Sequence, residues 1–98
     1  MIFQIEPGPS GVKFSLGQIV ATSHAISALS LADIRSALRR HATGDWGQLS
    51  EQDRLANESA LLKGDRLLSV YHSSTGVKFY VITEWDRSVT TVLLPKDY

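Results

Sequence analysis

The pattern of apolar and polar positions divides the chain into a helical block and a later block of strands. Side chains suited to a buried face recur at Leu31, Ile34, Leu38 and His41, which is the spacing of one face of an α-helix. After residue 65 the period changes from 3.6 to 2, and residues 66–73, 77–85 and 88–94 become rich in β-branched and aromatic side chains. The pattern therefore predicts helices followed by strands.

Capping residues indicate where the helices begin and end. Ser30 immediately precedes the amphipathic stretch, and Thr22 precedes a shorter helical segment, HAISAL. Ser50 followed three residues later by Asp53 resembles a capping box, so a further helix is expected from about residue 51 to residue 63, ending at a glycine. We therefore expect two to three helices in the middle of the chain.

The remaining segments complete the predicted fold. Prolines and glycines punctuate residues 1–11, which we interpret as an extended and loosely held arm. Residues 13–22, KFSLGQIVAT, predict an N-terminal strand, and short turn signals join the three later strands into an antiparallel meander. The expected fold of residues 12–98 is a single α+β domain with one N-terminal strand, a block of helices and a three-stranded β-meander packed on the helices.

Composition limits the classes of partner. The chain has 98 residues, enough for one core, and its ten basic side chains are balanced by ten acidic ones. This neutral charge disfavours a nucleic-acid partner or an anionic membrane, and the basic cluster Arg35, Arg39 and Arg40 is interpreted as a solvated helix face. The chain lacks cysteine, a secretory leader and a long apolar run, so a cytoplasmic location without membrane contact is expected.

The sequence contains no motif that demands a cofactor. It has no phosphate-binding P-loop, dinucleotide fingerprint, His-Glu-x-x-His pair or nucleophile elbow. Its three histidines, His24, His41 and His72, stand far apart, and without cysteine they make a weak case for a metal. We expect neither a cofactor nor a metal, and the sequence leaves the oligomeric state open.

The stretch HATGDWGQLSEQD contains a first candidate site, formed by His41, Asp45 and Trp46. A histidine near a helix C-terminus can cap or pack there, and an aspartate in a glycine-rich turn can accept hydrogen bonds from its own turn. We interpret this group as a structural corner in which Trp46 fixes the angle between two helices. Two alternatives are a catalytic His41 and an exposed Trp46 that anchors a protein interface.

A second candidate site lies at the hairpin between the last two strands. Trp85, Asp86 and Arg87 occupy the turn, and Tyr98 follows shortly after the final strand. Tryptophan and arginine are the side chains most enriched at interface hot spots, and loops often carry function. These four residues are the predicted protein-binding residues; the alternative is that the aromatic side chains pack at the edge of the domain.

Three stretches resemble a family of small proteins from plasmids and integrative conjugative elements, usually labelled plasmid-related proteins. They are RHATGDWG, GDRLLSVYHSSTG and VITEWDRSVTTVLLPKDY, which begin at residues 40, 64 and 81. The resemblance extends from LGQIVAT onward and implies an accessory gene carried by mobile DNA. Such genes often act on host defence or belong to toxin and antitoxin cassettes. The resemblance carries over no catalytic residue.

Two functions from different classes follow. The first is a non-enzymatic protein that binds a host or element-encoded protein, as an inhibitor of a host defence system. The second is a small ribonuclease, because the order of elements looks like the RelE and colicin nuclease folds and VITEWDRSVTTVLLP is similar to their final hairpin. The candidate catalytic residues would then be His41, His72, Arg87 and either Thr90 or Thr91, although no motif match supports them.

Overall fold

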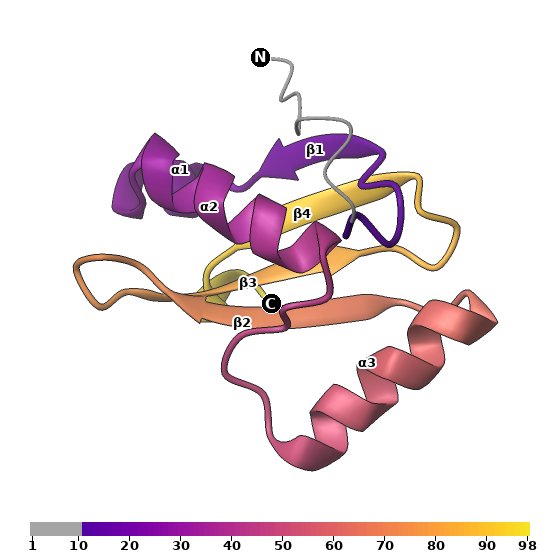
Figure 1. The fold of residues 1–98 in the computed structure, drawn as a ribbon. Coiled ribbons are helices and arrows are strands. Elements are labelled where there is room, and N and C mark those ends of the chain that lie inside the picture. The colour runs from indigo at the N-terminus through magenta and orange to yellow at the C-terminus, as the bar shows by residue number, and fades with distance from the viewer. Residues whose placement is uncertain (1–10) are drawn as a thin grey trace.

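The computed structural model describes residues 11–98, so the expected arm lies outside the described residues except for Gly11 (Figure 1). The fold is α+β, with a strand and three helices before residue 64 and three strands after it, as expected from the sequence. The elements in chain order are β1 (Gln18–Ala21), α1 (Ser23–Ala28), α2 (Leu31–Ala42), α3 (Glu51–Lys63), β2 (Leu67–His72), β3 (Lys78–Thr83), β4 (Val89–Leu93) and the 3-10 helix η1 (Pro95–Asp97).

The strands form one mixed sheet in the order β1-β4-β3-β2. Strands β2, β3 and β4 pair antiparallel, which confirms the predicted meander. Strand β1 pairs in parallel with β4, starting at Gln18 opposite Val89. The beginning of the described chain therefore lies against its end, and β1 and β2 are the two edges of the sheet.

The helices occupy two different positions around the sheet. Helices α1 and α2 cover one face, where Leu38 packs with Tyr71, Phe79, Val81 and Val92 in the main core (Figure 1). Helix α3 instead lies beside β2 (Figure 1). Within residues 11–98, no helix combines the length and the apolar character needed to cross a bilayer.

Local signals set the helix boundaries. The Ser30 hydroxyl accepts a hydrogen bond from the Asp33 backbone N–H at the start of α2, and Ser50 caps α3 in the same way. Helix α3 ends at Gly64, which has a φ of 77° and adopts the left-handed conformation that glycine tolerates. The expected helix over residues 51–63 is therefore confirmed.

The first strand is shorter than expected. Of the predicted residues 13–22, only the stretch from Gln18 to Ala21 is a strand. The preceding residues instead pass the C-terminal end of α2, where the Lys13 backbone N–H donates to the Ala42 carbonyl. Gly17 then has a φ of 63°, and a Cβ at this position would collide with the carbonyl oxygen of Ser88. This close approach of two backbones brings β1 beside β4.

The outer edge of β2 is covered by groups from α3 and from the segment before it. The Asn57 amide donates to the Leu68 carbonyl at 2.5 Å and accepts from the Leu68 N–H at 3.2 Å. Two residues further on, the Val70 N–H donates to the Trp46 carbonyl, and the Val70 carbonyl accepts from Gln48. The outward backbone groups of Leu68 and Val70 are thus paired without a further full strand.

The C-terminal turn is tied to the start of α1. The Asp97 carboxylate accepts hydrogen bonds from the Thr22 hydroxyl at 2.7 Å and from the Leu94 N–H at 3.1 Å, and it pairs with His24 Nδ1 at 2.6 Å. The hydrogen bonds from His24 and Thr22 lower the pKa of Asp97 to about 2. The last residues of the chain are therefore anchored beside the first helix.

We expect Asn57→Ala to lower the free energy of unfolding by about 2 kcal/mol, because it removes both side-chain hydrogen bonds to Leu68 and leaves a partly buried strand edge without partners. Urea unfolding monitored by circular dichroism measures the change. The matched control is Gln52→Ala, on the exposed face of the same helix, which should change the free energy by less than about 0.5 kcal/mol. Equal effects of the two substitutions would contradict the role of Asn57.

Candidate functional site

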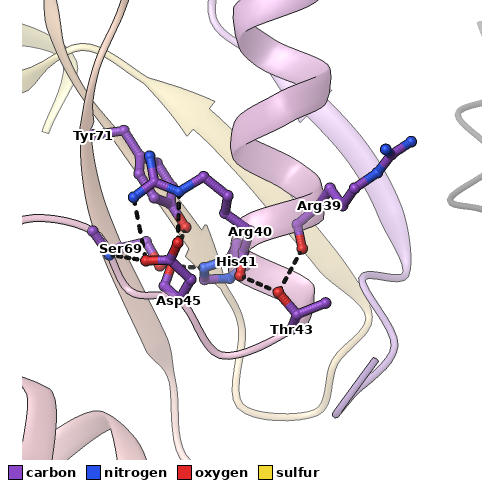
Figure 2. Close-up of polar contacts among 8 residues, drawn as sticks. Arg39, Arg40, His41, Thr43, Asp45, Ser69 and Tyr71 are labelled. Atoms are coloured by element: carbon purple, nitrogen blue, oxygen red, sulfur yellow. Dashed lines mark hydrogen bonds and ion pairs between the residues drawn. The ribbon is translucent and has the colours of Figure 1, made fainter. Parts of the chain in front are cut away.

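His41 lies in the last turn of α2 and is fully buried between that helix and the sheet. Its Nδ1 is 2.6 Å from the Ser69 hydroxyl on β2 (Figure 2), and its Nε2 is 2.9 Å from the Thr83 hydroxyl on β3. The rings of Phe14 and Trp46 contact the imidazole edge-on, with centroids at 5.2 and 5.7 Å. His41 therefore has a polar partner at each ring nitrogen and aromatic rings around it.

The hydroxyls beyond His41 fix the direction of the hydrogen bonds. The Thr90 hydroxyl donates to the Leu16 carbonyl at 2.7 Å, so in its contact with Thr83 at 2.7 Å it must accept. Thr83 then has no proton left for His41 and accepts from Nε2–H. Nδ1 must in turn accept from the Ser69 hydroxyl. We call this chain from Ser69 to Leu16 the histidine relay; it satisfies every polar atom with a neutral imidazole that carries its proton on Nε2.

Burial is the main reason that the pKa of His41 falls from 6.5 to about 3, and the positive charge of Arg87 lowers it further. At neutral pH the imidazole is therefore uncharged, in agreement with the donor and acceptor assignment of the relay. A general acid or base needs access to its substrate and a pKa near the working pH. His41 has neither, so its role is to join α2 to the sheet.

The turn after α2 is held by Asp45 (Figure 2). Its carboxylate accepts from Arg40 Nε at 2.7 Å and from the Gly47 N–H at 3.2 Å, and its carbonyl accepts from the Tyr71 hydroxyl at 2.6 Å. Arg40 also lies over the Tyr71 ring at 4.6 Å. The hydrogen bond from Arg40 holds the pKa of Asp45 below its usual value, so the charged carboxylate that holds the turn persists to a lower pH.

Trp46 is buried, with an exposed fraction of 3%. Its Nε1 donates to a Glu58 carboxylate oxygen on α3 at 2.6 Å, and its ring stacks on Phe14 with centroids 6.2 Å apart. The indole therefore joins the turn after α2 to the third helix. This position suits an anchor between helices and leaves no indole face for a partner protein.

Arg87 points into the domain. It adopts a left-handed backbone conformation with a φ of 61°, and its guanidinium lies over the Phe14 ring at 5.7 Å. Phe14 also contacts His41, so this one ring touches both Arg87 and the relay. Its guanidinium donates to the carbonyls of Ala60, Asp65, Glu84 and Trp85. Arg87 thus joins the β3–β4 turn to the end of α3.

Trp85 lies on the same turn but faces solvent, with an exposed fraction of 66%. The neighbouring Asp86 carboxylate accepts from both the backbone N–H and the hydroxyl of Ser88, at 3.1 and 2.6 Å, and these hydrogen bonds lower the pKa of Asp86. These hydrogen bonds and those of Arg87 fix the backbone conformation of the turn. The exposed indole of Trp85 is therefore carried by an ordered turn.

Tyr98 lies on the other face of the sheet from α2. Its ring meets Tyr80 edge-on at 5.8 Å, and its hydroxyl accepts from Arg66 Nη2 at 3.0 Å. Tyr80 alternates along β3 with the core residues Phe79 and Val81, so its side chain faces away from the main core. Tyr98 thus packs on the face of the sheet opposite α2.

The structure does not assemble the residues of the ribonuclease alternative. His41 is buried, whereas His72 is exposed at the far end of β2 opposite Lys78. Thr91 alternates with the core-facing Thr90, so it faces away from His41. Arg87 and His41 both contact Phe14, but Arg87 uses its donors on backbone carbonyls. Among residues 11–98, no group of three or more histidine and acidic side chains could hold a metal ion.

Two of the three hydroxyl residues of the relay, Ser69 and Thr83, were not among the candidates from the sequence, and Thr90 was named only as a catalytic alternative. All three are fully buried. The sequence did contain a signal for these hydroxyl residues, because each stands two positions along its strand from a large apolar side chain that faces the main core. A polar residue at a core-facing strand position needs an internal partner, and His41 was the polar residue on the core face of a helix.

No protein-family model matches the chain. No curated protein and no solved structure shows significant similarity to it.

We expect His41 to remain neutral from pH 7 down to pH 5, as the Nε2–H tautomer. Its folded-state pKa of about 3 lies below the unfolded value of 6.5, so the unfolded chain takes up the proton first as the pH falls. The contribution of His41 to stability is present above pH 6.5 and declines by roughly 1 kcal/mol per pH unit below it. Imidazole ¹⁵N shifts and urea unfolding at pH 7 and 5 measure both effects.

The control is His41→Leu, which retains the other two histidines and should lose less stability between pH 7 and pH 5 than the parent. If this variant does not fold, the ¹⁵N shifts of the parent still decide the question. A His41 signal that titrates near pH 6 would contradict the closed relay.

We expect Arg87→Ala to lower the free energy of unfolding by about 2 to 3 kcal/mol, because it leaves carbonyls at two turns without their charged donor. Thermal and urea unfolding measure this loss. The control Arg39→Ala removes an exposed arginine from α2 and should have little effect. An Arg87 variant as stable as the parent would show that the side chain is not needed to join the turn to α3.

Proposed function

We propose that the protein acts without catalysis, through a protein–protein interface centred on Trp85. The observation that supports this proposal is an indole with two thirds of its surface exposed, on a turn whose backbone is held by Arg87. Burying a large exposed aromatic side chain at a partner surface is a major source of binding free energy. In the isolated domain this side chain contributes little to the core.

The rigid support of Trp85 favours its use in binding. Arg87 Nη1 donates to the Trp85 carbonyl in the β3–β4 turn at 3.3 Å and to the Asp65 carbonyl after α3 at 2.6 Å. A single guanidinium nitrogen therefore holds both turns. An anchor that is already ordered loses less conformational entropy when a partner binds.

The proposed interface extends from the turn to its polar neighbour. Asp86 is charged and exposed beside Trp85, where it would contribute to the polar rim of the contact. Arg87 supports the interface from within, through the backbone that carries Trp85. Tyr98 lies on the other face of the sheet and would take part only with a partner that reaches around the sheet edge.

We place the partner among host or element-encoded proteins. The resemblance of RHATGDWG and VITEWDRSVTTVLLPKDY to plasmid-related proteins supports a role for mobile DNA, with a host defence complex as the target. Inhibition by steric block in the cytoplasm needs a complementary surface of roughly 800 Å² on each side and no catalytic group. The balanced charge suits recognition by shape more than by a long-range field.

The ribonuclease alternative gains no specific support. Its candidate base, His41, is enclosed by Phe14 and Trp46 and is neutral through the relay. Incubation of the purified protein with total RNA tests this alternative directly, and we expect the RNA to remain intact.

We expect Trp85→Ala to weaken partner binding by about 2 kcal/mol or more while leaving the free energy of unfolding within about 0.5 kcal/mol of the parent. Tagged parent and variant proteins are compared on lysate of a bacterial host, and any protein retained by the parent and lost by the variant is purified. Its affinity for both is then measured by calorimetry. Binding also gives a direct signal in a Trp46→Phe background, where the fluorescence of Trp85 should shift to shorter wavelength.

Val12→Ala supplies a matched control, because Val12 is an exposed apolar residue in the segment before β1. It should change neither the affinity nor the fluorescence shift. A purified partner that binds Trp85→Ala as tightly as the parent would refute an interface centred on this residue.

A further inference from the structure

Strand β1 forms one edge of the sheet and directs part of its backbone outward. The Thr22 N–H, just after the strand, donates to the Val92 carbonyl in β4. Because backbone groups alternate in direction along a strand, the N–H and C=O groups of Ile19 and Ala21 point away from β4. Within residues 11–98, β4 is the only strand that pairs with β1. The outer side of β1 therefore offers donors and acceptors in the spacing that another strand requires.

The side chains of β1 do not protect this edge. Natural proteins discourage pairing at an exposed edge with charges, proline, a bulge or a covering segment. At the β2 edge, Asn57 and the segment around Trp46 pair the outward groups. The four residues of β1, QIVA, include no charged residue and no proline. The β1 edge thus lacks the side chains that usually prevent the addition of a strand.

An apolar groove of about 340 Å³ lies beside β1 and the first two helices. All of its lining side chains are apolar, and three of them are exposed: Val20 at 38%, Ile26 at 63% and Leu31 at 45%. Ile19 and Ala21 pack against the main core, whereas Val20 between them faces the other side of the sheet. Because all three line the groove, it extends around the outer edge of the strand. A strand added to β1 would therefore bury apolar side chains as well as backbone groups.

We propose that the β1 edge binds the β1 edge of a second copy of this chain, antiparallel and about a two-fold axis at Val20. In this register Ile19 lies opposite Ala21 of the second copy and exchanges two hydrogen bonds with it, and the axis repeats the exchange. Val20 lies opposite Val20 of the second copy, in a pair without backbone hydrogen bonds whose side chains are close together. The two four-stranded sheets become one continuous sheet. The proposal is independent of the Trp85 interface.

The outward groups of β1 are complementary to themselves. Ile19 and Ala21 stand two positions apart, so a two-fold axis midway between them pairs each with the other. Like charges placed opposite each other in such a pair would be destabilising. Neither β1 nor the lining of the groove contains a charged residue, so a second copy meets no such repulsion. An uncharged edge also offers a charged foreign strand no electrostatic gain, which favours the second copy.

The same arrangement covers the groove. The two-fold axis is perpendicular to the sheet, so α1 and α2 of both copies lie on the same face. Ile19 and Ala21 of each copy are then on the face where Ile26 and Leu31 of the other copy line the groove. A contact limited to a four-residue strand and a few apolar side chains buries less than about 1,200 Å² in total, which is the range of weak complexes. We therefore expect a dissociation constant on the order of 10 to 100 µM.

Sedimentation equilibrium of the full-length chain at several concentrations tests the proposal by comparing Val20→Lys with Gln18→Lys. Both substitutions place a positive charge on the same face of the same edge strand. In the proposed register the new charge at position 20 lies opposite itself, whereas the one at position 18 lies opposite Thr22. Val20→Lys should raise the dissociation constant by about tenfold or more, and Gln18→Lys should change it by less than about threefold. Equal effects of the two variants would contradict an axis at Val20.

Mixing Val20→Lys with Val20→Glu gives a rescue that depends on the two-fold axis. Each variant alone should remain monomeric, whereas an equal mixture should form a dimer because opposite charges then face each other at position 20. Circular dichroism checks that both variants are folded. A mixture that stays monomeric, or a parent that is monomeric at about 1 mM, well above the expected dissociation constant, would overturn the proposal.

Amide hydrogen exchange in the parent gives a measurement that needs no variant. Exchange of the Ile19 and Ala21 amides should slow as the protein concentration rises through the dissociation constant, whereas exchange of Val81 in the central strand should not change. Protection of Ile19 and Ala21 that is already complete at low concentration would show that the chain covers its own edge. Fast exchange at every concentration would show that the edge stays open, and either result rules out self-pairing.

Discussion

The structure depends on one buried imidazole that must be satisfied at both nitrogens. His41 could not be placed between α2 and the sheet at an acceptable free energy unless Ser69 donated to it and Thr83 accepted from it. Thr83 accepts from His41 while its own hydroxyl donates to Thr90, whose hydroxyl in turn donates to the Leu16 carbonyl. The relay thereby joins α2, all three strands of the meander and the segment that leads into β1. A helix slipped by one residue would lose the hydrogen bonds from His41 to Ser69 and Thr83, so the relay specifies the position of α2 as well as stabilising it.

Side chains that hydrogen-bond to backbone groups make many of the remaining contacts between the elements of this small domain. Asn57 pairs the edge of β2, Arg87 joins two turns to the end of α3, and Asp97 holds the C-terminal turn to the start of α1. Each of these side chains replaces contacts that a larger protein would supply with another strand or helix. The arrangement leaves few exposed places at which a partner could bind without disturbing the fold. Trp85 is one such place, because its indole is not part of the core.

The features predicted correctly from the sequence are those that depend on neighbouring residues. Ser50 and Gly64 define α3 because capping and left-handed termination involve groups within one helical turn. The meander follows from alternation and short turns. By contrast, the parallel pairing of β1 with β4 joins residues about seventy positions apart, and no local pattern specifies it. The inward position of Arg87 was missed for the same reason, since its acceptors lie in α3, in the turn after it and in its own turn.

The candidate sites differ in the same way. Trp46 and Trp85 both stand beside turn residues in the sequence, yet one is 3% and the other 66% exposed. The difference lies in contacts with residues distant in the sequence. Trp46 stacks on Phe14 and donates to Glu58. The turn that carries Trp85 is held by Arg87, so its indole is not required to fill a cavity. A tryptophan held out of the core by a rigid turn retains its apolar surface for an external contact. The inward arginine is therefore the structural reason that the neighbouring indole is free to bind.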